Sequence, residues 1–557
     1  MPGYGYGISD WISSSKIAAR GGGIPPVNED FITKWAVSAA QTITLWSQQG
    51  TVSYNYDVDW GDGETETSIT ASDKTHEYAD ADTYTVTITG QFGGLKMSRA
   101  SAADKTALVE FVNWGISEVS GIYGYFKDCA NMVYSATDSP DLTNLTATSG
   151  NRLYSTFQGC DTITSLDLSG WTDTDNIINF TNAFYHMDSL TTLNLTGWDT
   201  SNVTTMVNMC NGTGDDSAGC DFTMPDLDWS ACTTFGSAFK NTHIKTIDVT
   251  GWTLRAAGVT LASMFYNAEE GSAGPSFSVD ATGWTNTSDI TSLSNFGRDS
   301  EFTSLDVTGW DTSNVTSFAL FIYNNLNLTH ITGLNGLDAS STTSINQAFL
   351  NCKSLNFGSG DTTNFGSNWG PNLGSCTNFA SAFSSVGYTT AGTAPPDVSN
   401  WDVSAGTTFA TMFYRCKWTG GADIDTSAWE ISSACTTMAS FVRECSTTKV
   451  DLSDTNCDLS GTTTMGSFGI NSSLTRLIFN ATLDKPDFSA CTNFASFLQG
   501  CTIATGDYDE LLLKLDDGGQ SGVTLHGGSS EYSAGAAADA HLALEGKFWS
   551  ITDGGEE

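Results

Sequence analysis

A strand pattern recurs through most of the chain. Short segments of alternating apolar and polar residues are each followed by Gly and Trp. An alternation with a period of two places every second side chain on one face of a β-strand, so each segment is expected to bury one face. Four clear examples are residues 165–171, 192–198, 246–252 and 304–310.

Each strand segment is followed by a segment with a different apolar spacing. Val203, Met206 and Met209 lie three residues apart behind Ser201 and Asn202. Ser and Asn are favoured at the N-cap of a helix, and a spacing of three fits one helix face. The sequence therefore predicts a strand and a short helix in every unit.

The large apolar residue that closes each unit gives the length of the repeat. The average step between these residues is about 28, which is typical of leucine-rich repeats. A unit of this size cannot bury its own apolar face, so neighbouring units are expected to stack into a solenoid with a continuous core. The closing residues are Phe126, Phe157, Phe184, Met209, Phe239, Phe265, Phe296, Phe321, Phe349, Phe383, Phe413, Phe441, Phe468 and Phe497.

The segments outside the repeats predict three further parts. Residues 1–27 are aperiodic and are expected to be an arm or linker, with Trp11 and Ile12 as a docking pair. Residues 28–95 contain short alternating strands at 42–45, 54–60 and 84–88, which predict a small antiparallel β-sandwich. The repeat solenoid is expected over 96–505. Residues 506–557, with a helix at 508–515 and a strand at 548–552, are expected to form an α/β cap on its end.

Two parts of the chain resemble known families. The run from Val58 to Gly63, with the strand at 84–88 behind it, resembles a polycystic-kidney-disease-type (PKD) domain. The repeats resemble the BspA-type leucine-rich repeats of bacterial surface proteins. Residues 197–204 and 309–316 match that pattern nearly letter for letter, whereas 333–338 and the unit around Trp369 depart from it. The resemblance implies a leucine-rich-type solenoid whose repeats are interaction surfaces, often adhesive, without catalytic residues.

Three carboxylates, Asp57, Asp59 and Asp62, surround the turn of the PKD-like segment. The resemblance implies that this turn is structural, and the carboxylates lack the stricter alternating order of a calcium loop. We therefore expect turn formation and no cofactor, with structural calcium as the open alternative.

The sequence contains no recognisable catalytic motif. The six His residues are dispersed, and no phosphate-binding loop or nucleophile elbow is present. Asp167, Asp248 and Asp306 recur at one repeat position, which is typical of a structural residue rather than of a unique catalytic pair. We predict a non-enzymatic protein with no catalytic, cofactor-binding or metal-binding residues, and the residues that bind a partner stay unknown.

Cysteine and tryptophan also recur at fixed positions of the repeat. Cys232, Cys376, Cys435 and Cys491 stand where other units carry Val203 or Val315, so Cys is expected to act as a small buried apolar residue. Reduced core thiols are expected, with disulfides as the alternative. Tryptophan just after the strand is expected to pack between repeats, with a sugar-binding ladder as the alternative. These tryptophans are Trp171, Trp198, Trp252, Trp284, Trp310, Trp401 and Trp429.

The charge balance narrows the choice of partners. Lys and Arg total 22 against 62 Asp and Glu, a formal net charge of −40 that repels phosphate backbones and anionic lipid. No apolar stretch reaches the roughly 20 residues that a membrane helix needs. Neither nucleic acid binding nor membrane insertion is therefore expected.

The start of the chain lacks the basic-then-apolar order of a secretion signal. We therefore expect a phage virion protein, such as a tail fibre, head fibre or spike, made in the host cytoplasm and displayed on the virion surface. Its arm would bind other virion proteins, and its repeats would face a host surface glycan or protein. The alternatives are a BspA-type adhesin on a cell surface and a glycan-degrading virion enzyme. Edge strands also allow a homo-oligomer.

Overall fold

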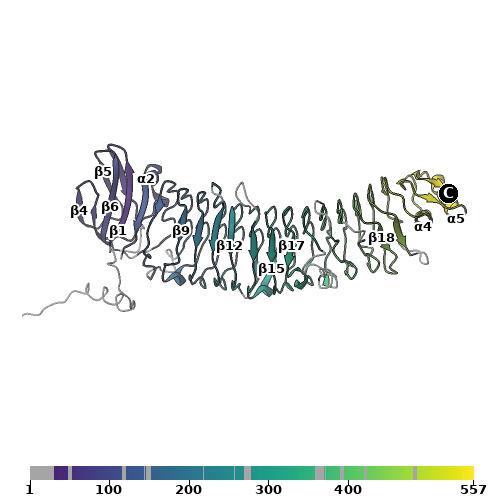
Figure 1. Cartoon of the computed structure of the whole chain (residues 1–557), viewed down its shortest axis with the longest axis horizontal. Helices are drawn as coiled ribbons and strands as arrows, with labels where there is room; N and C mark the ends of the chain where they lie inside the picture. Colours follow the sequence, from purple (N-terminus) through teal and green to yellow (C-terminus); the bar gives the residue numbers. More distant parts are fainter. Residues whose placement is uncertain are drawn as a thin grey trace, which may run out of the picture.

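The computed structural model is elongated, with an all-β domain at one end, a long row of stacked coils, and a segment with two helices at the other end (Figure 1). The arm expected over residues 1–27, with Trp11 and Ile12, lies outside the described residues. The structure describes residues 30–47, 53–115, 119, 121–143, 145, 152–216, 219–255, 258–268, 277–357, 369, 372–388, 394–418, 423–480 and 486–557.

The row of coils is a β-solenoid of about 15 turns. One of its faces carries a seven-stranded parallel sheet, to which each coil between residues 165 and 332 contributes one short strand. The alternating pattern sets the register, because the central apolar residue of each strand pairs with that of the next, as Leu166, Leu193 and Phe222 do. In spatial order the strands are β9 (Ser165–Asp167), β10 (Thr192–Asn194), β11 (Cys220–Thr223), β12 (Ile244–Asp248), β14 (Ser278–Asp280), β16 (Ser304–Asp306) and β17 (His330–Thr332). The predicted repeat strands are confirmed.

A second row of parallel bridges runs along another face of the coils. Single bridges join Thr205 to Thr234 and Thr234 to Thr260, and a later series runs from Ser317 to Asn493. Two short pairs of strands extend the parallel stacking, β13 (Val259–Thr260) with β15 (Ile290–Ser292) and β18 (Lys449–Leu452) with β19 (Arg476–Phe479). Among the coil residues that the structure describes there are three 3-10 helices, η3 (Thr174–Asn176), η4 (Thr287–Asp289) and η5 (Leu334–Gly336).

The short helix predicted in each unit is replaced by consecutive turns. Coils throughout the solenoid contain two residues with left-handed backbone four positions apart, such as Ser237 (φ 58°) and Asn241 (φ 52°). A left-handed residue cannot continue a right-handed helix. Backbone groups here also bond between coils, as where the Asn241 N–H donates to the Tyr266 carbonyl at 3.0 Å. The strand-plus-helix unit of a leucine-rich repeat is therefore corrected to a strand-plus-turn unit.

The N-terminal domain consists of antiparallel strands that join the solenoid without a break. A six-stranded sheet has the order β4-β3-β6-β1-β7-β8, and β2 pairs with β5. Strand β7 pairs antiparallel with β1 of the domain and parallel with β8 of the next coil, so the first coil continues the domain's sheet. The bounds are β1 (Phe31–Val37), β2 (Gln41–Leu45), β3 (Asn55–Asp59), β4 (Thr65–Ile69), β5 (Lys74–Tyr78), β6 (Asp82–Gln91), η2 (Met97–Arg99), α2 (Ala102–Ala107), β7 (Leu108–Asn113) and β8 (Val133–Tyr134).

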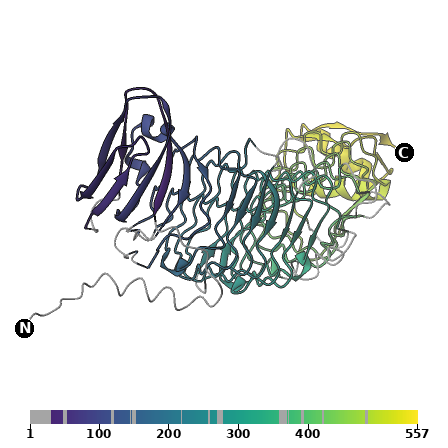
Figure 2. The same cartoon turned by 60° about the vertical axis from the view of Figure 1, so that its left-hand side comes forward.

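The last coil is followed by a mixed α/β segment. Leu525, in the first strand of this segment, forms a parallel β-bridge with Phe494 of the last coil. The Leu498 N–H of the same coil donates to the His526 carbonyl at 2.8 Å. The helix predicted at 508–515 lies within α4. The bounds are α4 (Thr505–Asp517), β20 (Thr524–His526), β21 (Glu531–Tyr532), α5 (Ala536–Gly546), β22 (Ser550–Thr552) and β23 (Gly555–Glu556). Figure 2 shows this segment and the N-terminal domain at opposite ends of the coils.

One continuous apolar core runs through the domain, the coils and the C-terminal segment. Phe residues that close neighbouring coils lie against each other inside it, for example Phe349 and Phe383 with ring centroids 5.4 Å apart. Among the described residues no helix has the length and apolar character needed to cross a lipid bilayer.

Candidate functional site

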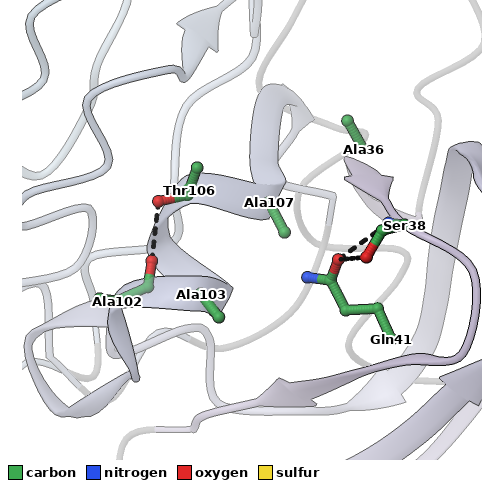
Figure 3. Close-up of a pocket in the computed structure, with 7 residues that line it drawn as sticks. All are labelled: Ala36, Ser38, Gln41, Ala102, Ala103, Thr106 and Ala107. Carbon is green, nitrogen blue, oxygen red and sulfur yellow. Dashed lines mark hydrogen bonds between the residues drawn. The ribbon is translucent and has the colours of Figure 1, made fainter.

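One shallow depression lies beside the ends of β1 and β2 and against α2. Inside it the Gln41 side-chain oxygen accepts hydrogen bonds from the Ser38 N–H and hydroxyl, at 2.8 and 3.0 Å. The Thr106 hydroxyl donates to the Ala102 carbonyl at 2.8 Å. The lining side chains are small or neutral, so the depression offers no titratable acid or base that could activate the hydroxyls of Ser38 and Thr106. They belong to Ala36, Ser38, Gln41, Ala102, Ala103, Thr106 and Ala107 (Figure 3).

The aspartates that recur in the repeats hold turns. The Asp167 carboxylate accepts a hydrogen bond from the Ser169 N–H, and Asp248 and Asp306 accept from the N–H two residues ahead in the same way. Such bonds close a short turn after the strand. The structural role predicted for these carboxylates is confirmed.

The three carboxylates of the PKD-like segment also bond to backbone groups. Asp57 accepts from the Ser68 N–H at 2.6 Å, and Asp59 accepts from the Gly61 N–H at 2.9 Å. Asp62 accepts from the Glu64 N–H at 2.9 Å and contacts His76 Nε2 at 2.7 Å. The predicted turn-forming role is confirmed for Asp59 and Asp62, whereas Asp57 bonds across to the paired strand β4. No group of three or more potential metal ligands occurs among the described residues, and the absence of a cofactor stays a prediction.

The recurring tryptophans lie in the core of the solenoid. Trp252 and Trp284 stack with ring centroids 5.3 Å apart, and both are nearly inaccessible to solvent. The Trp252 indole N–H donates to the Met224 carbonyl of the preceding coil at 2.7 Å. The burial of all seven rings confirms the packing role and removes them as a sugar-binding ladder.

A row of threonines lies on the outside of the coils, next to the second row of bridges. Thr233 and Thr343 are exposed, and each hydroxyl donates to the carbonyl of the equivalent Thr one coil earlier, at 3.1 and 3.0 Å. The row continues through Thr204, Thr291, Thr316, Thr377, Thr407, Thr436 and Thr463. Side chains of one kind are thus repeated at one coil spacing over most of the solenoid's length.

Comparison with known proteins places these repeats in a family. A family model described as "Mycoplasma protein of unknown function, DUF285" matches residues 96–219, 151–274, 259–386 and 367–456. The overlapping matches span 96–456, which is more than half of the chain. The chain belongs to the DUF285 family. No curated protein and no solved structure matches it.

Membership of the DUF285 family and the β-solenoid fold both fit the repeat surface protein predicted from the BspA-type pattern. The matches begin at residue 96 and therefore leave the N-terminal domain outside the family model.

All thirteen cysteines of this DUF285 protein are buried, and none of them forms a disulfide. Cys232 and Cys376 lie at the core position where Val203 and Val315 stand in other coils. Burial away from water disfavours the thiolate, so the pKa of each of these two thiols rises to about 12. The prediction that cysteine acts as a small buried apolar residue is confirmed, and the reduced state of the thiols stays a prediction.

A further row of side chains was not identified from the sequence. It occupies the position just before the second left-handed residue of each coil, on the corner of the solenoid. Its members share this place but not their chemistry, so no repeated letter revealed them. Aligning the units on the paired Asn, Ser or Gly residues of the turns would have brought them together. The row includes Tyr185, Asn211, Lys240, Tyr266, Arg298, Tyr323, Leu350, Ser384, Tyr414 and Arg443.

Proposed function

We propose that this chain is a non-enzymatic attachment protein that presents the outer faces of its solenoid to a partner surface. The observation that carries the proposal is the outer threonine row, in which one side chain recurs along most of the solenoid while the recurring tryptophans and the cysteines are buried. Stacked repeats create extended surfaces of this kind, and repeat proteins use them for binding. Family membership supports a role at a surface.

The enzymatic alternative is glycan hydrolysis in a virion. It requires two carboxyl groups that face a sugar from opposite sides. The recurring Asp167, Asp248 and Asp306 are instead bonded to backbone N–H groups of their own turns. These bonds favour an adhesive function over a hydrolytic one.

We further propose that a phage particle carries the protein, as a tail fibre, head fibre or spike, with a cellular adhesin as the alternative. The thirteen buried cysteines support this choice, because none of them forms a disulfide and disulfides form in oxidising compartments rather than in the reducing cytosol. Virion proteins fold in that cytosol. In this proposal residues 1–27 bind other virion proteins, the PKD-like domain is a spacer, and residues 506–557 cap the solenoid.

Binding to cells tests the attachment function. Fluorescently labelled protein should bind the surface of its host cells saturably, and an excess of unlabelled protein should displace it. Protein unfolded by heat is the control for non-specific adhesion. Binding that never saturates on any host strain, or that survives unfolding, would contradict the proposal.

Fractionation tests which particle or cell carries the protein. Mass spectrometry should find the chain in purified virions, bound in stoichiometric amounts. Finding it on cell surfaces in cultures without particles would favour the adhesin. Release of reducing ends from host glycans by purified protein would favour the enzyme.

A further inference from the structure

Four consecutive coils carry cationic and aromatic side chains in alternation on the corner row. Lys240, Tyr266, Arg298 and Tyr323 form this set, which we call the cationic ridge, and all four are partly exposed. The Lys240 ammonium lies 4.8 Å from the Tyr266 ring centroid. The Arg298 guanidinium lies 5.4 Å from the Tyr266 centroid and 5.1 Å from the Tyr323 centroid. The ridge is therefore a continuous stack along the solenoid axis.

Backbone hydrogen bonds fix the spacing of the ridge. The Asn241 N–H donates to the Tyr266 carbonyl at 3.0 Å, and the Asn267 N–H donates to the Arg298 carbonyl at 2.8 Å. Hydrogen-bonded strands lie about 4.8 Å apart, so the two cations, two coils apart, are separated by roughly 10 Å along the axis. The ridge thus presents positive charge with a period of two coils.

The positive charge of the ridge contrasts with the net charge of −40 of the whole chain. No described carboxylate lies within ion-pairing distance of Lys240. The Arg298 Nε contacts Asp299 at 3.0 Å and Nη1 contacts Asn295, whereas Nη2 makes no hydrogen bond to a described residue. Both cations therefore keep donors for a ligand.

A row of amides lies directly beside the ridge. The Asn267 side chain donates to Asn241 at 3.1 Å, and the Asn324 side chain donates to Asp299 at 3.0 Å. Each amide has two donor hydrogens and two acceptor lone pairs. The bonds between coils use only part of this capacity and leave the rest for hydroxyl groups of a ligand.

We propose that the cationic ridge binds an acidic polysaccharide that lies along the solenoid axis and carries an anionic group on every second sugar. This inference rests on the proposed attachment function and names the chemical class of its partner. The tyrosine rings stack on sugar rings. Lys240 and Arg298 pair with the anionic groups, and the amide row bonds to sugar hydroxyls. An extended polymer of alternating acidic and neutral sugars has its charges at a spacing comparable with that of the two cations.

The strong negative charge of the whole chain makes the affinity for a polyanion depend on ionic strength. At physiological salt, charges are screened beyond about 8 Å, so a polyanion experiences mainly the nearby ridge. At low salt, repulsion from the rest of the protein reaches further. Binding is therefore expected to be strongest at intermediate ionic strength and to weaken both in dilute buffer and in concentrated salt.

The test is a binding titration of the full chain with defined sugars. Hyaluronan oligosaccharides, in which glucuronic acid alternates with N-acetylglucosamine, should bind, and neutral chitin oligosaccharides should not. A sulfated polymer with the same disaccharide period separates carboxylate from sulfate recognition, and binding of either supports the ridge. Equal binding of the neutral polymer, or binding of none of the acidic ones, would overturn the proposal.

Substitutions locate the site. The double variant Lys240→Gln and Arg298→Gln should bind at least about tenfold more weakly, because it loses two charge-assisted contacts. The control is Lys245→Gln with Arg476→Gln, which removes two surface cations that are already paired with Asp221 and Asp507. The control should bind like the wild type, and Lys240→Arg with Arg298→Lys should retain most of the affinity. Equal loss in the control and the ridge variant would overturn the proposal.

Variants of Tyr266 test whether its ring stacks on a sugar ring, and binding to host cells distinguishes failure of the ridge proposal from failure of the attachment function. Tyr266→Phe should keep binding, whereas Tyr266→Ser should weaken it with an unchanged unfolding temperature. If the ridge variant binds host cells as well as the wild type does, the proposed role of the ridge is wrong, whereas the attachment function of the protein is still supported. If the wild type binds no cells, the attachment function itself fails.

Discussion

At the scale of single residues, the buried thiols make stability depend on pH. Burial raises the pKa of the Cys491 thiol to about 11 and that of Cys232 to about 12, from an ordinary value near 9. The folded state therefore holds these protons after the unfolded chain would release them. By linkage, the stabilisation is fully present below about pH 9 and is lost as the pH rises from there toward 12.

We expect the unfolding temperature to stay constant from pH 7 to about 8.5 and to fall at higher pH. Thermal unfolding followed by circular dichroism measures this. Cys232→Val is the matched control, because Val203 is buried at the same place in another coil. The variant should lose less stability above pH 9, and a decline identical to that of the wild type would contradict the linkage.

Burial was the residue property that the sequence predicted best. Cys alternates with Val at one position, and Trp recurs after several of the strands, so a buried environment could be inferred for each and both are confirmed. The corner row could not be inferred in this way. Most of its side chains are partly exposed and are less constrained by packing than core residues, so Lys240, Tyr266 and Leu350 share a place without sharing a residue type.

At the scale of elements, the turns explain why the predicted helix was wrong. Val203, Met206 and Met209 are all buried, as predicted, but the spacing of three comes from successive turns. The Met209 N–H donates to the Met206 carbonyl three residues back, at 3.1 Å, while the Met206 N–H donates to Thr234 of the next coil. A spacing of three does not distinguish a helix from such turns. The strands were predicted correctly because alternation has no competing interpretation of similar length.

Ser237 provides a test of the left-handed turns. Its backbone has φ 58°, a region that costs a β-branched residue about 1–2 kcal/mol more than it costs Gly. We expect Ser237→Val to lower the free energy of unfolding by about this amount, and Ser237→Gly to leave it nearly unchanged. Urea denaturation measures both. Equal stability of the two variants would mean that this residue is not left-handed in solution.

At the scale of the whole molecule, the solenoid has ends that must be covered. The last coil buries Phe494 and Leu498 beneath the C-terminal segment, where Trp549 lies 6.0 Å from the Phe494 ring. Strands at an open end also present unpaired backbone groups to other chains. The α/β terminal segment could be predicted because the repeat pattern ends where this segment begins. Its strand pairs, such as β21 with β23, could not be predicted, because no short sequence pattern indicates which strands pair.

We expect removal of residues 505–557 to cause aggregation, because the truncation uncovers an apolar edge. Light scattering and size-exclusion chromatography measure the effect. Leu542→Gln is the control, since this side chain on α5 is already 68% exposed. A monomeric truncated protein with an unchanged unfolding temperature would show that the segment is dispensable.

The hydrogen bonds between coils run along the long axis, and this gives the molecule a mechanical character. A force that pulls the two ends apart acts along these hydrogen bonds, so it breaks them sequentially, one coil at a time, and does not load many of them in shear at once. Each coil that peels away releases about 28 residues, or on the order of 90 Å of extended chain. A solenoid of this design yields under load and lengthens greatly before it fails, so it absorbs energy if its two ends are attached to separate surfaces and these are pulled apart.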